Sequence, residues 1–417
     1  MFFGRPGFLA GRPMRARHFR GGPSFPFPTG FSVAFLSALP AGAAFPATIP
    51  EERQRPLRER PDMRRQRMTE QQSVDQELAN EVAKISSLMG PWAVRVASTL
   101  RLPDHIAAGT TKVSELAQLT GSDPDVLGRL LRYLSVLGVF REEAPGEYQV
   151  TELGEFFRDD HPMKLRRFLD QNGFGAKLDA VTARLEQGVR TGRTVYEDVF
   201  GRRFWEDQDD YPDPELSFNT LMADHTRWFG PDIRDSFDWG AHKLIVDVGG
   251  GTGAGTLLHE LLTHFPGMRG ILVEDPRETA TSAAGSLGPI GDRCTLVRQS
   301  LFDPMPQGGD VYVLTNILRN WNQQDAIRIL RRCAEAAGPD GDVLVLERIL
   351  SAEDQHQIHV ADANLRILLL LGGKERTLEE FREIGRAAGL ELTATTPTGY
   401  SHMYLIRYSA AGRGHQA

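Results

Sequence analysis

A chain of 417 residues, of which 41% are hydrophobic and 25% charged, is long enough for two or three domains that each bury a core. The formal net charge of −7 argues against nucleic acid as the main partner, because neutralising phosphates needs a basic surface. Only two cysteines occur, which excludes a disulfide framework and a zinc site built from cysteines and favours a reducing cytoplasm. No apolar run of about 18 residues is present, so no membrane span is expected.

Residues 1–67 differ in composition from the rest of the chain. They contain 12 arginines, no lysine, four acidic residues and ten prolines, without helical or strand periodicity. The apolar stretch 31–47 is compatible with a signal peptide, and the whole segment with an arginine-rich transit peptide. We prefer a disordered extension, or upstream sequence that precedes a true start at Met63 or Met68. Residues 1–67 are therefore expected to carry no fold.

Residues 68–175 are predicted to form a mostly helical winged-helix domain. Apolar residues recur at helical spacing from Leu78 to Val94, in a helix that reaches toward Leu100. The elements expected after it are a short helix opening at Thr111, a helix over 123–137 and two strands, 139–142 and 148–151, that turn at Pro145–Gly146.

A winged helix can bind DNA or serve as a packing and dimerisation unit. The helix over 123–137 would have to enter the major groove, but its basic residues are only Arg129 and Arg132, and it begins with aspartates. We therefore interpret the domain as a dimerisation unit.

The remaining chain is divided into linking helices over 176–240, an α/β domain over 241–410 and a tail over 411–417. In the α/β domain, short apolar strands alternate with amphipathic helices, which predicts an open, doubly wound sheet with its ligand at the carboxyl ends of the strands. Strands are expected at 243–248, 270–274, 294–298, 311–314 and 342–347, with a final antiparallel hairpin of 390–397 and 402–407 at one edge, and helices at 256–264 and 325–337.

The segment LIVDVGGGTGAGT, residues 244–256, reads as a buried strand, a glycine loop and a helix. Its glycines allow a ligand to approach the backbone closely. Asp247 before the loop suits a cationic ligand group and would repel a diphosphate, and no P-loop lysine follows. Glu274 ends the next strand, where an acid can accept hydrogen bonds from ribose hydroxyls. The pair of features predicts a nucleoside ligand.

The motifs FNTLMADHTRWF, KLIVDVGGGTGAG, GILVEDP, RQSLFDPMP, LTNILRNW and LGGKERTLEEF occur in this order between Asp75 and Tyr408. In them the chain resembles the small-molecule O-methyltransferases of the caffeic-acid and hydroxyindole type, including bacterial members that tailor anthracyclines and polyketides. The resemblance implies S-adenosylmethionine as cofactor, a Rossmann-like domain for it, an N-terminal winged-helix dimerisation domain and a homodimer.

The resemblance also implies roles for single residues. Asp247, Gly249 and Gly251 would surround the methionine part of the cofactor, and Glu274 would bind the ribose. The other positions carried over are Ser300 and Leu301 beside the adenine, Trp321 and Thr226 closing the pocket, and Phe218, Met222 and Asn320 facing the methyl group and substrate.

Four positions depart from the family pattern: Ser300, Arg319, Asn320 and Asn364. Ser300 replaces an aspartate, but a hydroxyl can still make one hydrogen bond to adenine. Arg319 and Asn320 replace the histidine and aspartate of a His-Asp-Trp motif, in which the histidine is the general base. Arginine stays protonated and cannot accept a proton, so that mechanism is lost.

Arg319 leaves two interpretations open. It can favour an already ionised substrate oxygen or clamp a carboxylate, with Glu347 and Glu375 as supporting acids. It can instead be only a structural partner of those two acids. In the family the acids orient the base, and Asn364 replaces another acid.

The remaining candidates are weaker. His225 could act as a base, although a lone histidine is more often structural. His356 and His359 precede Asp362 at helical spacing, but the polar run from Ser351 reads as a solvated loop that leads into a helix. We predict no metal.

The leading hypothesis is a dimeric methyltransferase that acts on an aromatic or polyketide-derived small molecule in secondary metabolism, most simply at oxygen. The second hypothesis keeps fold and cofactor but assigns hydroxylation, decarboxylation or pericyclic chemistry. The third is a winged-helix DNA-binding regulator.

Overall fold

The computed structural model describes residues 61–207, 213–250, 255–276, 287–351, 358–400 and 402–411, with the side chains of 61–73 and 214 excepted. The chain divides into two compact units, Met1–Glu77 and Leu78–Ala417. Helix α1 (Pro61–Ser86) crosses this division and begins inside the segment expected to carry no fold, which corrects that expectation for residues 61–67. No helix in the described ranges is long and apolar enough to cross a membrane.

A winged-helix unit follows α1, as predicted. The helix expected to reach Leu100 is interrupted at Ser87 and Leu88, and α2 begins at Met89. The side chain of Asp123 caps the helix predicted at 123–137 by accepting a hydrogen bond from the backbone N–H of Val126 at 3.0 Å. The elements are α2 (Met89–Thr99), α3 (Leu102–Ala107), α4 (Val113–Thr120), α5 (Pro124–Val136), β1 (Phe140–Ala144), β2 (Glu147–Val150) and α6 (Glu152–Glu155).

Helices link this unit to the α/β domain. The long helix α11 is capped by Ser217, whose hydroxyl accepts a hydrogen bond from the N–H of Thr220 at 3.3 Å. The linking elements are α7 (Leu165–Leu169), α8 (Phe174–Thr182), α9 (Leu185–Thr191), α10 (Tyr196–Phe200), the 3-10 turns η1 (Phe204–Asp207), η2 (Pro214–Leu216) and η3 (Trp239–Ala241), and α11 (Phe218–Asp235).

The described part of the α/β domain contains an eight-stranded sheet in the order β5-β4-β3-β6-β7-β10-β9, with β8 paired to β7. Strands β3 to β7 are parallel, whereas β10 runs antiparallel to β7 and β9. The strands are β3 (Leu244–Val248), β4 (Arg269–Glu274), β5 (Cys294–Arg298), β6 (Val311–Thr315), β7 (Asp342–Leu350), β8 (Arg376–Thr377), β9 (Leu390–Pro397) and β10 (Met403–Ala410). The predicted open α/β sheet and its terminal hairpin are confirmed.

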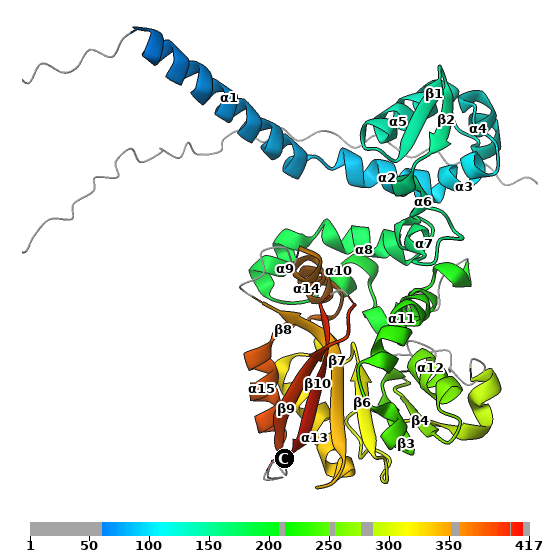
Figure 1. Ribbon diagram of the computed structural model, residues 1–417, viewed down its shortest axis with the longest axis vertical. Coiled ribbons are helices and arrows are strands. Elements are labelled where there is room, and N and C mark those ends of the chain that lie inside the picture. Colours follow the sequence, from blue (N-terminus) through cyan, green and yellow to red (C-terminus); the bar gives the residue numbers. More distant parts are fainter. Residues whose placement is uncertain are drawn as a thin grey trace, which may run out of the picture. The chain divides into compact units, whose positions relative to one another are not determined.

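Helices cover both faces of this sheet (Figure 1). Alternate strand residues face opposite sides, so Ile245, Val313 and Leu344 pack against α11 and α12 on one face. Val246, Tyr312 and Val345 pack against α13 and α15 on the other. The bounds are α12 (Thr256–His264), η6 (Gly288–Arg293), η7 (Leu318–Asn320), α13 (Gln323–Ala337), α14 (Ile358–Leu371) and α15 (Leu378–Ala387).

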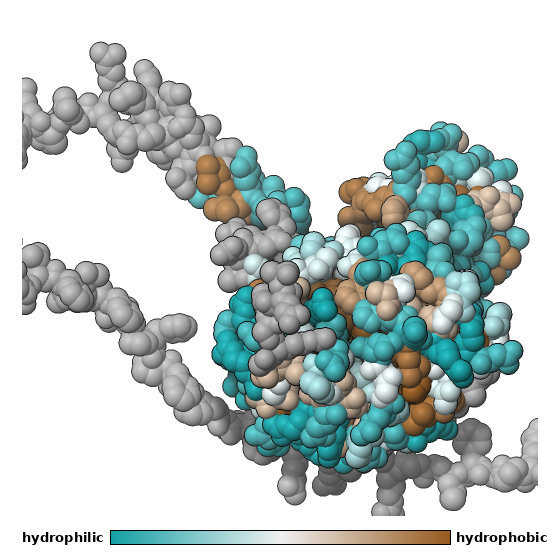
Figure 2. Space-filling model, turned by 60° about the horizontal axis from the view of Figure 1, so that its bottom comes forward, coloured by the Kyte–Doolittle hydropathy of each residue, from teal (hydrophilic) through white to brown (hydrophobic). Residues whose placement is uncertain are grey.

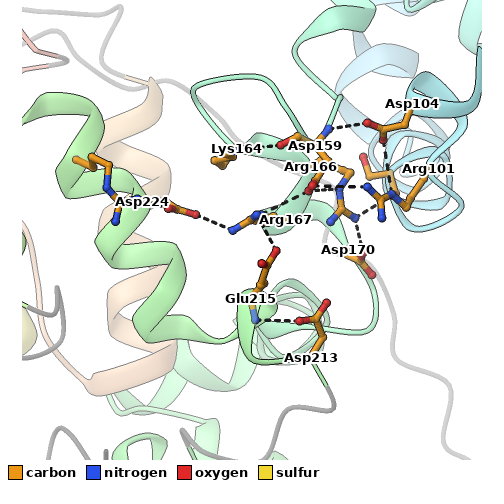
Figure 3. Close-up of polar contacts among 12 residues, drawn as sticks. Arg101, Asp104, Asp159, Lys164, Arg166, Arg167, Asp170, Asp213, Glu215 and Asp224 are labelled. Carbon is orange, nitrogen blue, oxygen red and sulfur yellow. Dashed lines mark hydrogen bonds and ion pairs between the residues drawn. The ribbon is translucent and has the colours of Figure 1, made fainter. Parts of the chain in front are cut away.

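A cluster of buried arginines joins the winged-helix unit to the linking helices (Figure 3). Arg166 pairs with Asp159 at 2.8 Å and with Asp170 at 2.6 Å. The guanidinium of Arg167 contacts Glu215 at 2.8 Å and Asp224 of α11 at 3.0 Å. Asp224 lies on α11, which also lines the cavity described next.

Candidate active site

A cavity of about 650 Å³ opens at the carboxyl ends of β3, β6 and β7, where a doubly wound sheet is expected to bind its ligand. Its walls come from four parts of the chain, the linking helices, α11, α14 and the strand ends. Six of the cofactor, catalytic and substrate positions named from the sequence line it directly: Asp247, Thr226, Phe218, Met222, Arg319 and Asn320.

Asp247 is the next-to-last residue of β3 and lines the cavity there. Its side chain is buried, and its Oδ1 has no hydrogen-bond partner among the described residues. Burial raises the pKa of this carboxyl to about 7. A buried acceptor without a donor is costly, so Asp247 suits a ligand that brings a cationic N–H group.

The backbone of the first glycines of the loop packs closely against the side chains of Asp247 and Ile317. A Cβ on Gly250 would lie 2.2 Å from Oδ2 of Asp247, and one on Gly249, at φ +81°, would lie 2.7 Å from Ile317. A residue with a side chain would therefore collide with Ile317 at position 249 and with Asp247 at position 250, so both positions require glycine. The ammonium of the methionine part of S-adenosylmethionine would supply the donor that the buried Oδ1 of Asp247 lacks among the described residues. Gly251 lies outside the described residues.

The positions expected to bind the nucleoside lie nearby but do not line this cavity. Glu274 is buried at the end of β4, with its Oε2 3.1 Å from Nε of Arg298. Leu301 is buried, and its N–H donates to Asp275 at 3.1 Å, while the hydroxyl of Ser300 accepts from the N–H of Phe302 at 3.2 Å.

Trp321 lines a second cavity of about 600 Å³. Asn320, Trp205 and Leu370 border both spaces, so the two cavities share a wall. Trp321 thus lies on the side of that wall away from Asp247.

Arg319 lies on the turn η7 and faces the main cavity. One nitrogen of its guanidinium is 2.8 Å from Glu375, and its backbone N–H donates to Glu347 at 3.0 Å. Asn364 accepts the N–H of Glu375 at 2.9 Å and so anchors that acid. The ion pair with Glu375 agrees with a purely structural role of Arg319. The position of Arg319 on the cavity wall agrees with a role in the chemistry.

Glu347 lies beneath this turn and is completely buried. Burial is the main cause that raises its pKa to about 7, against the opposing charge of Arg376. Arg376 is itself buried and donates to the carbonyls of Leu318 and Trp321 at 2.7 and 2.8 Å. The turn that presents Arg319 is therefore tied at both ends.

The far end of the cavity is apolar and aromatic. Phe218 and Met222 lie one turn apart on α11, and Phe168, Phe174 and Trp205 complete this wall. The ring of Phe218 meets that of Phe174 edge to face at 5.1 Å. Such a compartment accommodates a flat aromatic molecule.

Arg348 and Tyr400 are among the cavity residues that had no role assigned from the sequence, and His225 was considered more often structural than a base. Nε2 of His225 lies 2.9 Å from the hydroxyl of Tyr400. Burial and the charges of Arg348 and Arg319 lower the pKa of His225 to about 4, which leaves it a weak base at neutral pH. Strand alternation was the signal that could have found Arg348, because it shares a face with Leu344 and Leu346.

The histidine pair considered for metal is only partly described. His359 lines the cavity from α14, Asp362 pairs with Arg366 at 2.7 Å, and His356 lies outside the described residues. Within the described ranges, no group of three or more His, Cys, Asp or Glu residues could hold a metal ion.

Comparisons with known proteins agree with this geometry. Family models match for an O-methyltransferase dimerisation domain over residues 84–160 and an O-methyltransferase domain over residues 182–391. Relatives include 2,7-dihydroxy-5-methyl-1-naphthoate 7-O-methyltransferase of Streptomyces carzinostaticus, 41% identical over 76% of this chain and 94% of that protein. Aclacinomycin 10-hydroxylase of Streptomyces purpurascens is 36% identical over 78% and 87%.

Among solved structures, an O-methyltransferase from neocarzinostatin biosynthesis, in complex with S-adenosylmethionine and 2-hydroxy-5-methyl naphthoic acid, superposes with a TM-score of 0.69. It is 38% identical, and the match covers 78% of this chain and 98% of that one. The winged-helix unit and the doubly wound sheet are therefore those of a known family: this chain belongs to the S-adenosylmethionine-dependent O-methyltransferases.

Proposed function

We propose that this enzyme methylates a hydroxyl of an aromatic small molecule in secondary metabolism, without a proton-accepting side chain at position 319. The observation that carries the proposal is Arg319, a permanent cation on the cavity wall, paired with Glu375. The aromatic end of the cavity and the naphthoate named for the relative of Streptomyces carzinostaticus support an aromatic substrate.

The proposed cofactor contacts lie at the carboxyl ends of β3 and β4. Asp247 would hold the ammonium of the methionine part, next to Gly249 and Gly251, and Glu274 would hold the ribose. Ser300, Leu301, Trp321 and Thr226 remain proposals for the adenine and the pocket wall. S-adenosylmethionine bound there supplies an electrophilic methyl group on a sulfonium.

Arg319 would favour an ionised substrate oxygen. A cation beside a phenol lowers the pKa of the phenol, so the proton leaves to solvent and the phenolate remains as nucleophile. General bases typically contribute roughly 10²- to 10⁴-fold to a rate, whereas fixed proximity and orientation supply about 7–11 kcal/mol. Positioning by Phe218, Met222 and Asn320 would therefore sustain transfer without a base.

A second candidate is cofactor-dependent chemistry other than methyl transfer. It is favoured by the hydroxylase of Streptomyces purpurascens, which is 36% identical to this chain. Mass spectrometry of products formed with S-adenosylmethionine from hydroxylated naphthalenes and benzoic acids separates the candidates. A gain of one methyl supports the proposal, and a gain of one oxygen or a loss of carbon dioxide supports the second candidate.

Arg319 itself is tested with three variants, Arg319→Ala, Arg319→Lys and Arg319→His. We expect alanine to abolish turnover while affinity for S-adenosylhomocysteine is kept, and lysine to rescue only in part, because an ammonium lacks the planar fork. The histidine variant should gain a rate inflection near the pKa of imidazole. If all three turn over substrate like the parent, Arg319 is only a structural partner of Glu375.

We also propose that the chain acts as a homodimer and does not bind DNA. The matched dimerisation model and an exposed apolar face on α1 and α2 support the dimer. On α5, Arg129 already pairs with Asp125 at 2.5 Å, so little free positive charge faces outward. The two free, buried cysteines support a reducing cytoplasmic setting.

A further inference from the structure

The arginines that line the main cavity differ in whether they form an ion pair. Arg319 is paired with Glu375 at 2.8 Å, and Arg366 with Asp362 at 2.7 Å. Arg348 also lines the cavity, but its guanidinium makes no ion pair within the described ranges, and its buried Nε, like that of Arg319, has no hydrogen-bond partner there. Since a buried donor without an acceptor is costly, this site favours an anionic occupant.

The groups that surround Arg348 do not supply that anion. The charges acting on its guanidinium come from Arg319, Glu375 and Tyr400, of which Glu375 is already engaged by Arg319. Burial and the repulsion of Arg319 lower the pKa of Arg348, and burial raises the pKa of Tyr400, which keeps its hydroxyl neutral. His225 is also neutral at pH 7, because its pKa is about 4.

The placement of Arg348 follows from strand alternation. Asp247, Thr315 and Arg348 lie at or near the carboxyl ends of three neighbouring strands and face the same side of the sheet, toward α11. Glu347, one residue earlier, faces the opposite side and accepts the N–H of Arg319. Arg348 is therefore free to contact a ligand held between the strand ends and the aromatic wall.

We infer that Arg348 binds a carboxylate carried by the aromatic substrate, so that the cavity selects aromatic hydroxy acids over neutral phenols; this inference rests on the proposed function. The planar guanidinium presents parallel N–H donors that match the two oxygens of a carboxylate. Arg319 then remains available for the reacting oxygen. Arg348 is a specificity-determining residue in this scheme.

The test measures binding rather than turnover, so it does not depend on which reaction follows. Protein saturated with S-adenosylhomocysteine is titrated calorimetrically with 3-hydroxy-2-naphthoic acid and with 2-naphthol at pH 7.5. We expect the parent to bind the acid about ten- to a hundredfold more tightly, as a charge-assisted hydrogen bond predicts. Arg348→Met should remove this preference and leave the affinity for 2-naphthol unchanged, and Arg348→Lys should keep part of it.

Arg366→Met is the matched control, because Arg366 lines the same cavity but is already paired. A preference for the acid that survives in Arg348→Met overturns the inference, as does its loss in Arg366→Met alone. Unchanged affinity of each variant for S-adenosylhomocysteine shows that the fold is intact. Equal affinity of the parent for acid and naphthol also overturns it, and this outcome needs no variant. Absence of methylated product, with the preference intact, would count against the proposed function only.

Discussion

Asp247 and Glu347 are buried carboxyls whose pKa is raised to about 7 by burial. Ordinary values are 3.8 and 4.5, so the unfolded chain releases these protons at lower pH than the folded protein. Each group therefore favours the folded state most below about pH 4, and this contribution is lost as the pH rises to 7. The cofactor-free protein should accordingly lose stability across that window from these two groups.

Cofactor binding should show the opposite pH dependence at Asp247. Its carboxylate must be ionised to hold an ammonium, so affinity for S-adenosylhomocysteine should fall about tenfold from pH 8 to pH 6. Asp247→Asn should bind more weakly at pH 8 and lose this slope. Calorimetry at pH 6, 7 and 8 measures both effects. A variant with the parent's slope would show that another group controls it.

Two residues that line the cavity differ in how far the sequence indicated them, Asp247 and Arg348. Asp247 could be recognised because it directly precedes a glycine loop at the end of an apolar strand. Arg348 was missed because an arginine near a strand end is usually solvated; strand alternation indicates which face it shares with Leu344 and Leu346, but only the pairing of β7 with β6 shows which strand lies beside it. Its lack of a partner depends on side chains that are distant in sequence, such as Glu375 and Tyr400.

At the scale of elements, α11 connects the cavity to the buried arginine cluster. Arg167→Met removes the contacts with Asp224 and Glu215. Breaking a buried pair usually costs about 3–5 kcal/mol, and the exposure of Glu215 reduces this to an expected loss of about 2–3 kcal/mol in the free energy of unfolding. Urea denaturation measures it. Substrate affinity should also fall, because Met222 and Thr226 are carried by the same helix.

Arg227→Met is the control for this prediction. Arg227 contacts the same Asp224, at 2.6 Å, but its side chain is 67% exposed. An exposed pair contributes up to about 1 kcal/mol, so this variant should be close to the parent. Equal losses in the two variants would mean that Arg167 contributes no more than a surface arginine.

The elements also show where periodicity fails as a predictor. Apolar spacing continues across Ser87 and Leu88 without a break, so one helix was predicted where α1 and α2 occur. Pro91 explains the difference, because it lacks the N–H that a continuous helix would bond to Ser87 but fits the first turn of a new one. Pro61 similarly opens α1, in a segment whose composition suggested no structure.

At the scale of the molecule, an apolar face on α1 and α2 remains exposed in the single chain. Figure 2 shows apolar side chains on the described surface of α1 among hydrophilic ones. This face comprises Leu78, Val82, Ile85, Leu88, Met89, Trp92 and Val96, which are 38–83% exposed. We propose that this face forms the interface of the proposed homodimer, because exposed apolar patches of this kind often mark protein interfaces.

We expect Ile85→Glu to convert the dimer to a monomer. Burial of an isoleucine contributes about 1.5–3 kcal/mol, and a two-fold interface contains it twice, so the dissociation constant should rise at least about a hundredfold. Light scattering coupled to size-exclusion chromatography measures the change. Val189→Glu, which replaces another exposed apolar side chain on α9, should remain dimeric. A dimeric Ile85→Glu would place the interface elsewhere.

Glu347 and Arg348 face opposite sides of the sheet, and this has a consequence for how the substrate preference of the enzyme can change by mutation. One residue supports the turn that carries Arg319, and its neighbour faces the ligand from the other side of the sheet. A substitution at 348 can thus alter which compound is accepted while the reacting position keeps its support. We therefore expect single substitutions at position 348 to change substrate selectivity while Glu347 continues to support Arg319. A library randomised at position 348 alone would test which new acceptor substrates are bound.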